Sequence, residues 1–288
     1  MALNFKLFYQ SSGMKHDHYT LGEIMSKKND HLVLDRPEIL NLLFHPRKES
    51  GRTFPAFALN QDIATDNGIH IGTRLYLTDP DMPHILFFHG NGEIAEDYDD
   101  IGSIYMNFGL NFIVVDYRGY GRSNGSPGIS SMFSDAHFVL KHFSGWLEQN
   151  QRKGPLWLMG RSLGSASAIE LAASFPKKIN GLIIESGFAH TLPLLQRLGI
   201  NTEILNIEDS RVFSNAEKIS RFAGPTLIIH GQYDQIIPLQ HGKDLFARSP
   251  AGRKKMHIIN GADHNTLLMI GGRQYFEIIR DFINQANP

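Results

Sequence analysis

Short apolar runs alternate with amphipathic patterns along most of this chain. The apolar runs are nearly continuous, which is typical of strands buried on both faces of a parallel sheet. They cover residues 85–88, 112–115, 156–159, 181–184, 226–229 and 256–259. Helical spacing predicts helices at residues 94–108, 132–149, 166–174, 240–247 and 274–285. This alternation predicts an α/β fold with a doubly wound, mostly parallel sheet and right-handed crossovers.

Two segments depart from this alternation. Residues 63–77 are typical of a β-hairpin, because Asp66-Asn67-Gly68 is a turn signal and the following apolar residues alternate. Residues 187–222 are longer than a simple crossover and are rich in leucine and isoleucine. We expect this second segment to be a short helical lid inserted after one strand.

The sequence predicts a division near residue 60. Residues 1–60 are expected to form an N-terminal extension, and residues 61–288 the main domain with its lid at about 187–222. Residues 1–31 are polar and lack periodicity, whereas residues 32–44 have helical spacing with Pro37 near the start. We interpret His16-Asp17-His18 as a solvated polar stretch rather than a metal pair, since no pattern positions further ligands.

Composition excludes several classes of function. The formal net charge of −1 gives no electrostatic basis for binding nucleic acid or an anionic membrane. Cysteine is absent, which excludes disulfides, thiolate zinc sites and a cysteine nucleophile. The first ten residues do not resemble a secretory signal, and no run approaches the roughly 20 apolar residues that span a bilayer. We therefore expect a cytoplasmic protein.

The segment Gly160-Arg161-Ser162-Leu163-Gly164 indicates the chemistry. It has the pattern Gly-x-Ser-x-Gly and lies between an apolar run and a helical pattern. A sharp turn from a buried strand into a helix exposes the serine at the tip of the turn. The helix N-terminus then directs free N–H groups and a positive dipole end at the group that the serine attacks. Ser162 is therefore the candidate nucleophile.

Polar, glycine-rich segments follow the other apolar runs, and they supply partners for Ser162. Ligands bind beyond the carboxyl ends of strands in an open parallel sheet, so these segments are expected to meet at one edge. His264 can accept the serine proton as general base, and Asp234 can fix the imidazole tautomer. The order serine, aspartate, histidine along the chain is that of one known type of catalytic triad.

Negative charge that develops on a substrate carbonyl oxygen needs N–H donors. The candidates are the amide of Leu163, directly after the nucleophile, and the amide of Asn91, directly after His89-Gly90. We interpret His89 as a structural residue that holds this loop.

Other residues could fill some of these roles. Asp209 is a weaker candidate for the acid because no strand precedes it, and Asp263 adjoins His264 too closely for the required geometry. Three arginines near the predicted edge can either brace loops or bind a substrate carboxylate, and we favour bracing; they are Arg118, Arg122 and Arg161.

Taken together, these motifs resemble those of the α/β-hydrolase superfamily, in its serine-aminopeptidase-like and monoglyceride-lipase-like branch. The matching segments are residues 89–92, 116–123, 160–164, 230–234 and 261–264, within a resemblance that spans about residues 60–285. The resemblance implies that Ser162, Asp234 and His264 are catalytic and that Asn91 and Leu163 form the oxyanion hole.

The expected function is that of a serine esterase or thioesterase that acts through an acyl-enzyme and needs no metal or organic cofactor. Its expected partner is a small-molecule acyl substrate, because the apolar lid favours a hydrophobic group in the pocket. One alternative is an aminopeptidase, for which Glu203, Glu208 and Asp209 are the acids available in the lid. The other is a binding module that uses the fold without catalysis.

Overall fold

The computed structural model describes residues 32–65 and 68–286 of the 288-residue chain. The predicted polar arm with His16-Asp17-His18 lies outside the described residues, as do Asp66 and Asn67 of the hairpin turn. No helix among the described residues is both long enough and apolar enough to cross a membrane.

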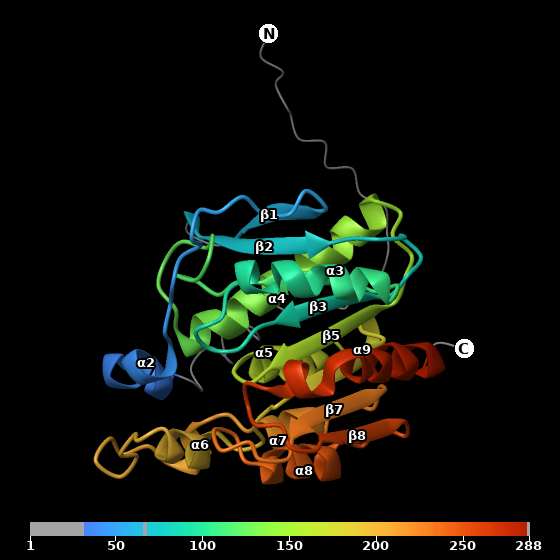
Figure 1. The fold of residues 1–288 in the computed structure, drawn as a ribbon. Coiled ribbons are helices and arrows are strands. Elements are labelled where there is room, and N and C mark those ends of the chain that lie inside the picture. The colour runs from blue at the N-terminus through green and yellow to red at the C-terminus, as the bar shows by residue number, and fades with distance from the viewer. Residues whose placement is uncertain (1–31, 66–67, 287–288) are drawn as a thin grey trace, which may run out of the picture.

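The strands of the described chain form one eight-stranded sheet in the order β1-β2-β4-β3-β5-β6-β7-β8 (Figure 1). Strands β1 and β2 are the predicted hairpin; β2 also pairs antiparallel with β4, and the remaining neighbours are parallel. The strands are β1 (Ala58–Ala64), β2 (His70–Tyr76), β3 (His84–Phe88), β4 (Asn111–Val115), β5 (Leu156–Arg161), β6 (Gly181–Glu185), β7 (Thr226–Gly231) and β8 (Lys254–Ile259). All six predicted apolar runs are therefore strands, and the predicted doubly wound α/β fold is confirmed.

Helices cover both faces of the sheet. The α-helices are α2 (Pro37–Leu43), α3 (Asp99–Asn107), α4 (Ile129–Gln149), α5 (Gly164–Ser174), α6 (Thr191–Arg197), α7 (Asn215–Ile219), α8 (Leu239–Arg248) and α9 (Leu267–Ala286). Short 3-10 helices are η1 (Leu32–Asp35), η3 (Ala95–Tyr98), η4 (Pro176–Lys178) and η5 (Asp209–Arg211). Helix α9 consists of two helices joined at Gly272, whose φ of +48° and ψ of −135° are not helical, so the helix predicted at residues 274–285 is the second of the two.

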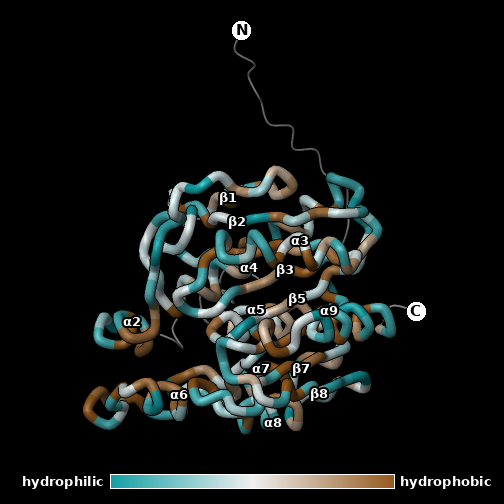
Figure 2. Tube along the Cα trace, viewed as in Figure 1, coloured by the Kyte–Doolittle hydropathy of each residue, from teal (hydrophilic) through white to brown (hydrophobic). Residues whose placement is uncertain are grey.

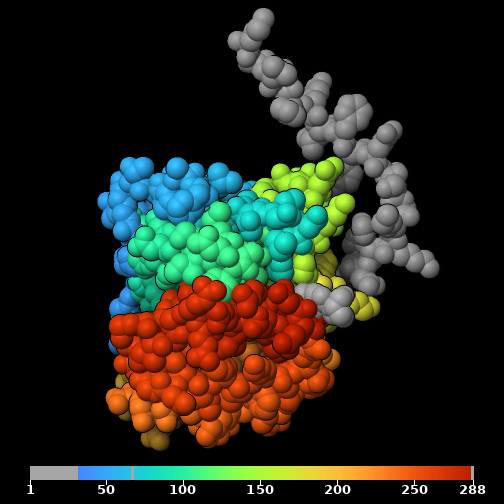
Figure 3. All heavy atoms as spheres, turned by 45° about the vertical axis from the view of Figure 1, so that its right-hand side comes forward, coloured from blue at the N-terminus to red at the C-terminus, as the bar shows by residue number. Residues whose placement is uncertain are grey.

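Side chains alternate between two apolar layers along the central strands. Phe87 of β3 packs in the cluster that contains α3 and α9, whereas its neighbour Phe88 packs in the cluster that contains α4 and α5. Figure 2 shows hydrophobic residues along β3, β5 and β7, and Figure 3 shows the C-terminal residues, in red, as a band across one face. Burial on both faces explains why these strands are apolar at nearly every position.

The described part of the N-terminal extension packs on the main domain. Leu34 of η1 and Ile39 of α2 are fully buried in the same cluster as α4 and α5. In Figure 1, α2 and α6 both lie on the side toward which β3 points. Arg36 Nη1 donates a hydrogen bond of 2.7 Å to the carbonyl of Leu205, so the extension also contacts the predicted lid. The domain division at residue 60 and the function of residues 187–222 as a lid stay predictions.

The winding of the chain reverses at β3. From β3 the chain adds β4 on one side and then β5 on the other. In open α/β sheets, ligands bind outside the carboxyl ends of the strands at such a switch point. The loop after β3 contains Asn91 and the turn after β5 contains Ser162, so two predicted site segments flank the switch point.

Candidate active site

The turn after β5 has the sharp geometry predicted for a nucleophile. Ser162 has a φ of +51°, in the left-handed region that non-glycine residues seldom adopt. A Cβ on Gly160 would lie 2.3 Å from the carbonyl oxygen of Gly164, and one on Gly164 would lie 2.0 Å from that of Phe88. Both glycines are therefore required by close backbone approach, which lets α5 begin directly behind the serine.

Ser162 lies within hydrogen-bond distance of His264. The Oγ of Ser162 is 2.9 Å from Nε2 of His264, and Nδ1 of the same ring is 2.7 Å from Oδ2 of Asp234. Since a carboxylate only accepts hydrogen bonds, Nδ1 carries the proton and Nε2 is left to accept from the serine hydroxyl. The structure thus brings the three predicted catalytic side chains together, with the imidazole in the middle.

Asp234 is held as a buried carboxylate. Its Oδ1 accepts hydrogen bonds of 3.0 Å and 2.8 Å from the backbone N–H groups of Ile236 and Ile237. Burial alone would raise the pKa of Asp234, but the hydrogen bond and charge of His264 hold it below its ordinary value. Asp234 is therefore ionised beside the imidazole, the state that stabilises an imidazolium.

The alternative acids lie in different surroundings. The Oδ1 of Asp263 accepts hydrogen bonds from the amides of Asn265 and Thr266, so this exposed carboxylate is used within its own loop. Asp209 is exposed in η5, and the lid residues Glu203 and Glu208 are exposed as well.

The two predicted oxyanion donors lie on different segments, Asn91 in the loop after β3 and Leu163 in the turn after β5. In the described chain, the backbone amides of Asn91 and Leu163 donate no hydrogen bond to another protein group. The amide of Gly90 is different, because it donates a 2.7 Å hydrogen bond to Oε2 of Glu93. His89 is fully buried, with Nδ1 2.8 Å from the carbonyl of Gly90, which agrees with a structural role.

The N-terminal extension reaches the loop after β3, a contact that no sequence pattern predicted. The side chain of Asn91 accepts hydrogen bonds from the His45 amide at 3.0 Å and from the Tyr120 hydroxyl at 2.7 Å. The Arg47 guanidinium donates to the carbonyl of Gly92 at 2.6 Å. No local signal marks these contacts, since His45 lies 46 positions before Asn91.

The three arginines all pair with protein carboxylates, as the bracing interpretation predicts. Arg118 forms two hydrogen bonds to Asp135, at 2.6 and 2.7 Å, and Arg122 forms two to Asp62, at 3.2 and 3.0 Å. Arg161 pairs with Glu93 and Glu185. Among the described residues, no three His, Asp or Glu side chains are grouped so that they could hold a metal ion.

Comparisons with known proteins agree with the fold. A family model for serine aminopeptidase, S33, matches residues 80–199. An uncharacterized membrane protein of Saccharomyces cerevisiae is 34% identical over 191 residues, which is 64% of each chain and thus just under two thirds of the yeast protein. Alpha/beta hydrolase domain-containing protein 17B of Homo sapiens is 29% identical over 233 residues, covering 77% of this chain and 73% of the human one.

Solved structures show the same fold at low sequence identity. An esterase of Pyrococcus furiosus has a TM-score of 0.66 at 16% identity, covering 84% of this chain and 98% of the esterase. A monoacylglycerol lipase of Paleococcus ferrophilus has a TM-score of 0.57 at 19% identity, covering 76% and 99% of the two chains. The chain has the α/β-hydrolase fold, and its similarity to these proteins supports the α/β-hydrolase superfamily and hydrolase chemistry in the broad sense.

Proposed function

We propose that this protein is a serine hydrolase that cleaves a carboxylic ester or thioester through an acyl-enzyme. The observation that carries the proposal is the chain of hydrogen bonds from Ser162 through His264 to Asp234. A serine hydroxyl is a weak nucleophile until an adjacent base accepts its proton, and this chain supplies that base in the required tautomer.

In the proposed reaction, Ser162 Oγ attacks the substrate carbonyl carbon while His264 Nε2 takes the hydroxyl proton. The amides of Asn91 and Leu163 donate to the oxygen on which negative charge develops. His264 then gives its proton to the leaving alcohol or thiol, and the acyl group stays on the serine. Water then gives a proton to the same Nε2 as it attacks the acyl-enzyme. The acid is released when Ser162 Oγ departs and recovers that proton from His264.

The lid favours an apolar acyl group. Leu198 is 38% exposed and Ile204 is 74% exposed, so apolar side chains of this segment are available for contact. The named esterase and monoacylglycerol lipase with the same fold are consistent with a hydrolysable acyl ester. The acids that an aminopeptidase would need are exposed to solvent, where a carboxylate binds an amine weakly.

The test is a series of p-nitrophenyl esters of increasing chain length, with an acyl thioester and an aminoacyl naphthylamide alongside. We expect ester or thioester cleavage, labelling by a fluorophosphonate probe, and loss of both in a folded Ser162→Ala variant. Cleavage of the naphthylamide alone would favour the aminopeptidase. A folded wild-type protein that neither reacts with the probe nor cleaves any substrate would favour the binding module.

A cytoplasmic location is a separate proposal, based on the sequence. Fractionation of cells that produce the full chain would test it, with recovery in the soluble fraction expected. Recovery with membranes would contradict it and would agree with the name of the yeast relative.

A further inference from the structure

Arg161, the residue before the nucleophile, connects three loops of the candidate active site. Its Nε donates to Glu93 Oε1 at 2.7 Å, its Nη1 to Glu185 Oε1 at 2.5 Å, and its Nη2 to the backbone carbonyl of His264 at 2.9 Å. These partners follow β3, end β6 and follow β8, respectively. One planar guanidinium therefore joins the loop after β3, which contains Asn91 (the oxyanion loop), the end of β6, and the loop after β8, which contains His264 (the histidine loop).

The two carboxylates extend these connections. Glu93 Oε2 accepts hydrogen bonds from the Gly90 amide at 2.7 Å and from the Tyr98 hydroxyl at 2.6 Å. Glu185 accepts a hydrogen bond from the Tyr275 hydroxyl of α9, and its backbone carbonyl accepts one of 2.9 Å from the Ser162 amide. The contacts of Arg161 thus reach the residue before Asn91 and the backbone of the nucleophile itself.

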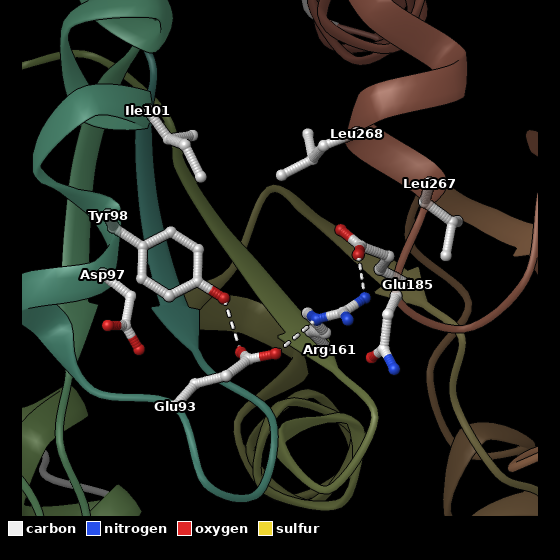
Figure 4. A pocket seen from close by; sticks show the side chains of 9 residues that line it. Glu93, Asp97, Tyr98, Ile101, Arg161, Glu185, Leu267 and Leu268 are labelled. Carbon is white, nitrogen blue, oxygen red and sulfur yellow. Dashed lines mark hydrogen bonds and ion pairs between the residues drawn. The ribbon is translucent and has the colours of Figure 1, made fainter.

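This group of charges is largely withdrawn from solvent. The side chains of Arg161 and Glu185 are 11% and 3% exposed. A cavity of about 190 Å³ lies above them, between the start of α3 and the start of α9 (Figure 4). Burial would raise the pKa of Glu93, but the Arg161 charge and hydrogen bonds from Tyr98 and Arg161 lower it to about 2. Glu93 and Arg161 are therefore both charged at neutral pH.

Each of the three guanidinium nitrogens donates to a protein acceptor, so three of the five N–H groups of Arg161 are used within the protein. We propose that Arg161 is a positioning residue, which holds the His264 ring and the Asn91 amide in register with Ser162. It touches no reacting atom. The inference rests on the proposed hydrolase function, since it assigns the residue that keeps that site assembled. Displacement of about 1 Å in such a site lowers the rate by about a hundredfold.

The test is Arg161→Lys in the full chain. Lysine keeps a cation between the two carboxylates but cannot donate to three partners in one plane. We expect kcat on p-nitrophenyl esters to fall by about tenfold to a hundredfold, with KM within about twofold of wild type. Arg118→Lys is the matched control, because it also breaks a two-bond arginine–carboxylate pair but leaves the histidine loop untouched. We expect its kcat to stay within about twofold of wild type.

A second readout does not depend on turnover. The low-field proton resonance of His264 Nδ1–H, assigned by its loss in His264→Ala, should shift or broaden in Arg161→Lys. If wild type proves to have no hydrolase activity, this resonance still reports whether Arg161 holds His264. Failure of the proposed hydrolase function can therefore be told apart from failure of the proposed positioning by Arg161. Should Arg161→Lys not fold, Glu93→Gln is expected to lower kcat at unchanged KM. An unchanged kcat, or a raised KM alone, in the folded variant would overturn the proposal.

Discussion

Ser162 and His264 are 102 positions apart in the chain and 2.9 Å apart in space. Ser162 follows β5 and His264 follows β8, which is three strands away in the sheet. Since neighbouring strands are about 4.8 Å apart, the loop after β8 must reach back across β7 and β6. A Cβ on Gly231, at the end of β7, would lie 2.8 Å from carbonyl oxygens of that loop. The close passage of the loop over β7 is therefore part of what makes the site.

Replacement of Asp234 by asparagine should reduce ester cleavage severely. The asparagine amide would favour the imidazole tautomer whose Nε2 carries the proton, so the ring could no longer accept from Ser162. We expect kcat to fall by roughly ten-thousandfold with the fold intact, as in other enzymes of this mechanism. Steady-state kinetics and circular dichroism would check this.

Asp263→Asn is the matched control for that variant. Asparagine keeps the side-chain oxygen that accepts from the Asn265 and Thr266 amides. We expect kcat within about threefold of wild type. The opposite result, in which Asp263→Asn is inactive and Asp234→Asn is active, would move the acid to position 263.

Gly164→Ala should destabilise the protein. The new Cβ would lie 2.0 Å from the carbonyl oxygen of Phe88, and both backbones are fixed by the sheet and by α5. We expect the free energy of unfolding to fall by about 1–3 kcal/mol or more, measured by urea denaturation. Gly145→Ala is the control in the interior of α4, where a Cβ would meet nothing within 4 Å. That variant should be stabilised by about 0.5–1 kcal/mol, and equal effects at the two positions would contradict this explanation.

Glu93 should make the free energy of unfolding depend on pH. Its folded pKa of about 2 lies below the ordinary value of 4.5, so the unfolded chain binds this proton more readily. The stabilisation is complete above about pH 4.5 and is lost progressively as the pH falls toward 2. Urea denaturation between about pH 5 and pH 3 should therefore show a smaller loss of stability in Glu93→Gln than in wild type. Parallel stability curves would rule out this ion pair as the cause.

Lys218 should anchor α7 to the main domain. Its Nζ lies 2.7 Å from Glu170 of α5 and 3.9 Å from the ring centroid of Phe133 in α4. Lys218→Met removes a cation from a largely buried carboxylate, so we expect a loss of roughly 3 kcal/mol in the free energy of unfolding. Arg273→Met is the control, because its 2.7 Å pair with Glu277 involves an arginine side chain that is 77% exposed. The control should change stability by less than about 1 kcal/mol, and similar losses in both variants would refute the assignment.

The elements could be predicted from the sequence because local periodicity specifies them. The apolar run at residues 85–88 became β3, and Gly160-Arg161-Ser162-Leu163-Gly164 became the turn between β5 and α5. Gly271-Gly272 also acts as the breaker that local preference predicts, since Gly272 has a non-helical φ of +48° and separates the two helices of α9. The first of these helices, which begins at Leu267, was not predicted; Leu267 packs in the apolar layer formed by distant elements.

By itself, the sequence determined which side chains were available for chemistry and that each follows an apolar, strand-like run, because both properties are local. Only the tertiary structure decided that Asp234 is the aspartate paired with the His264 ring, that Arg161 bonds to the His264 carbonyl across 103 positions, and that His45 reaches Asn91 across 46. These contacts depend on the lateral order of the strands and on the paths of the loops over them. Neither is encoded in the spacing of neighbouring residues.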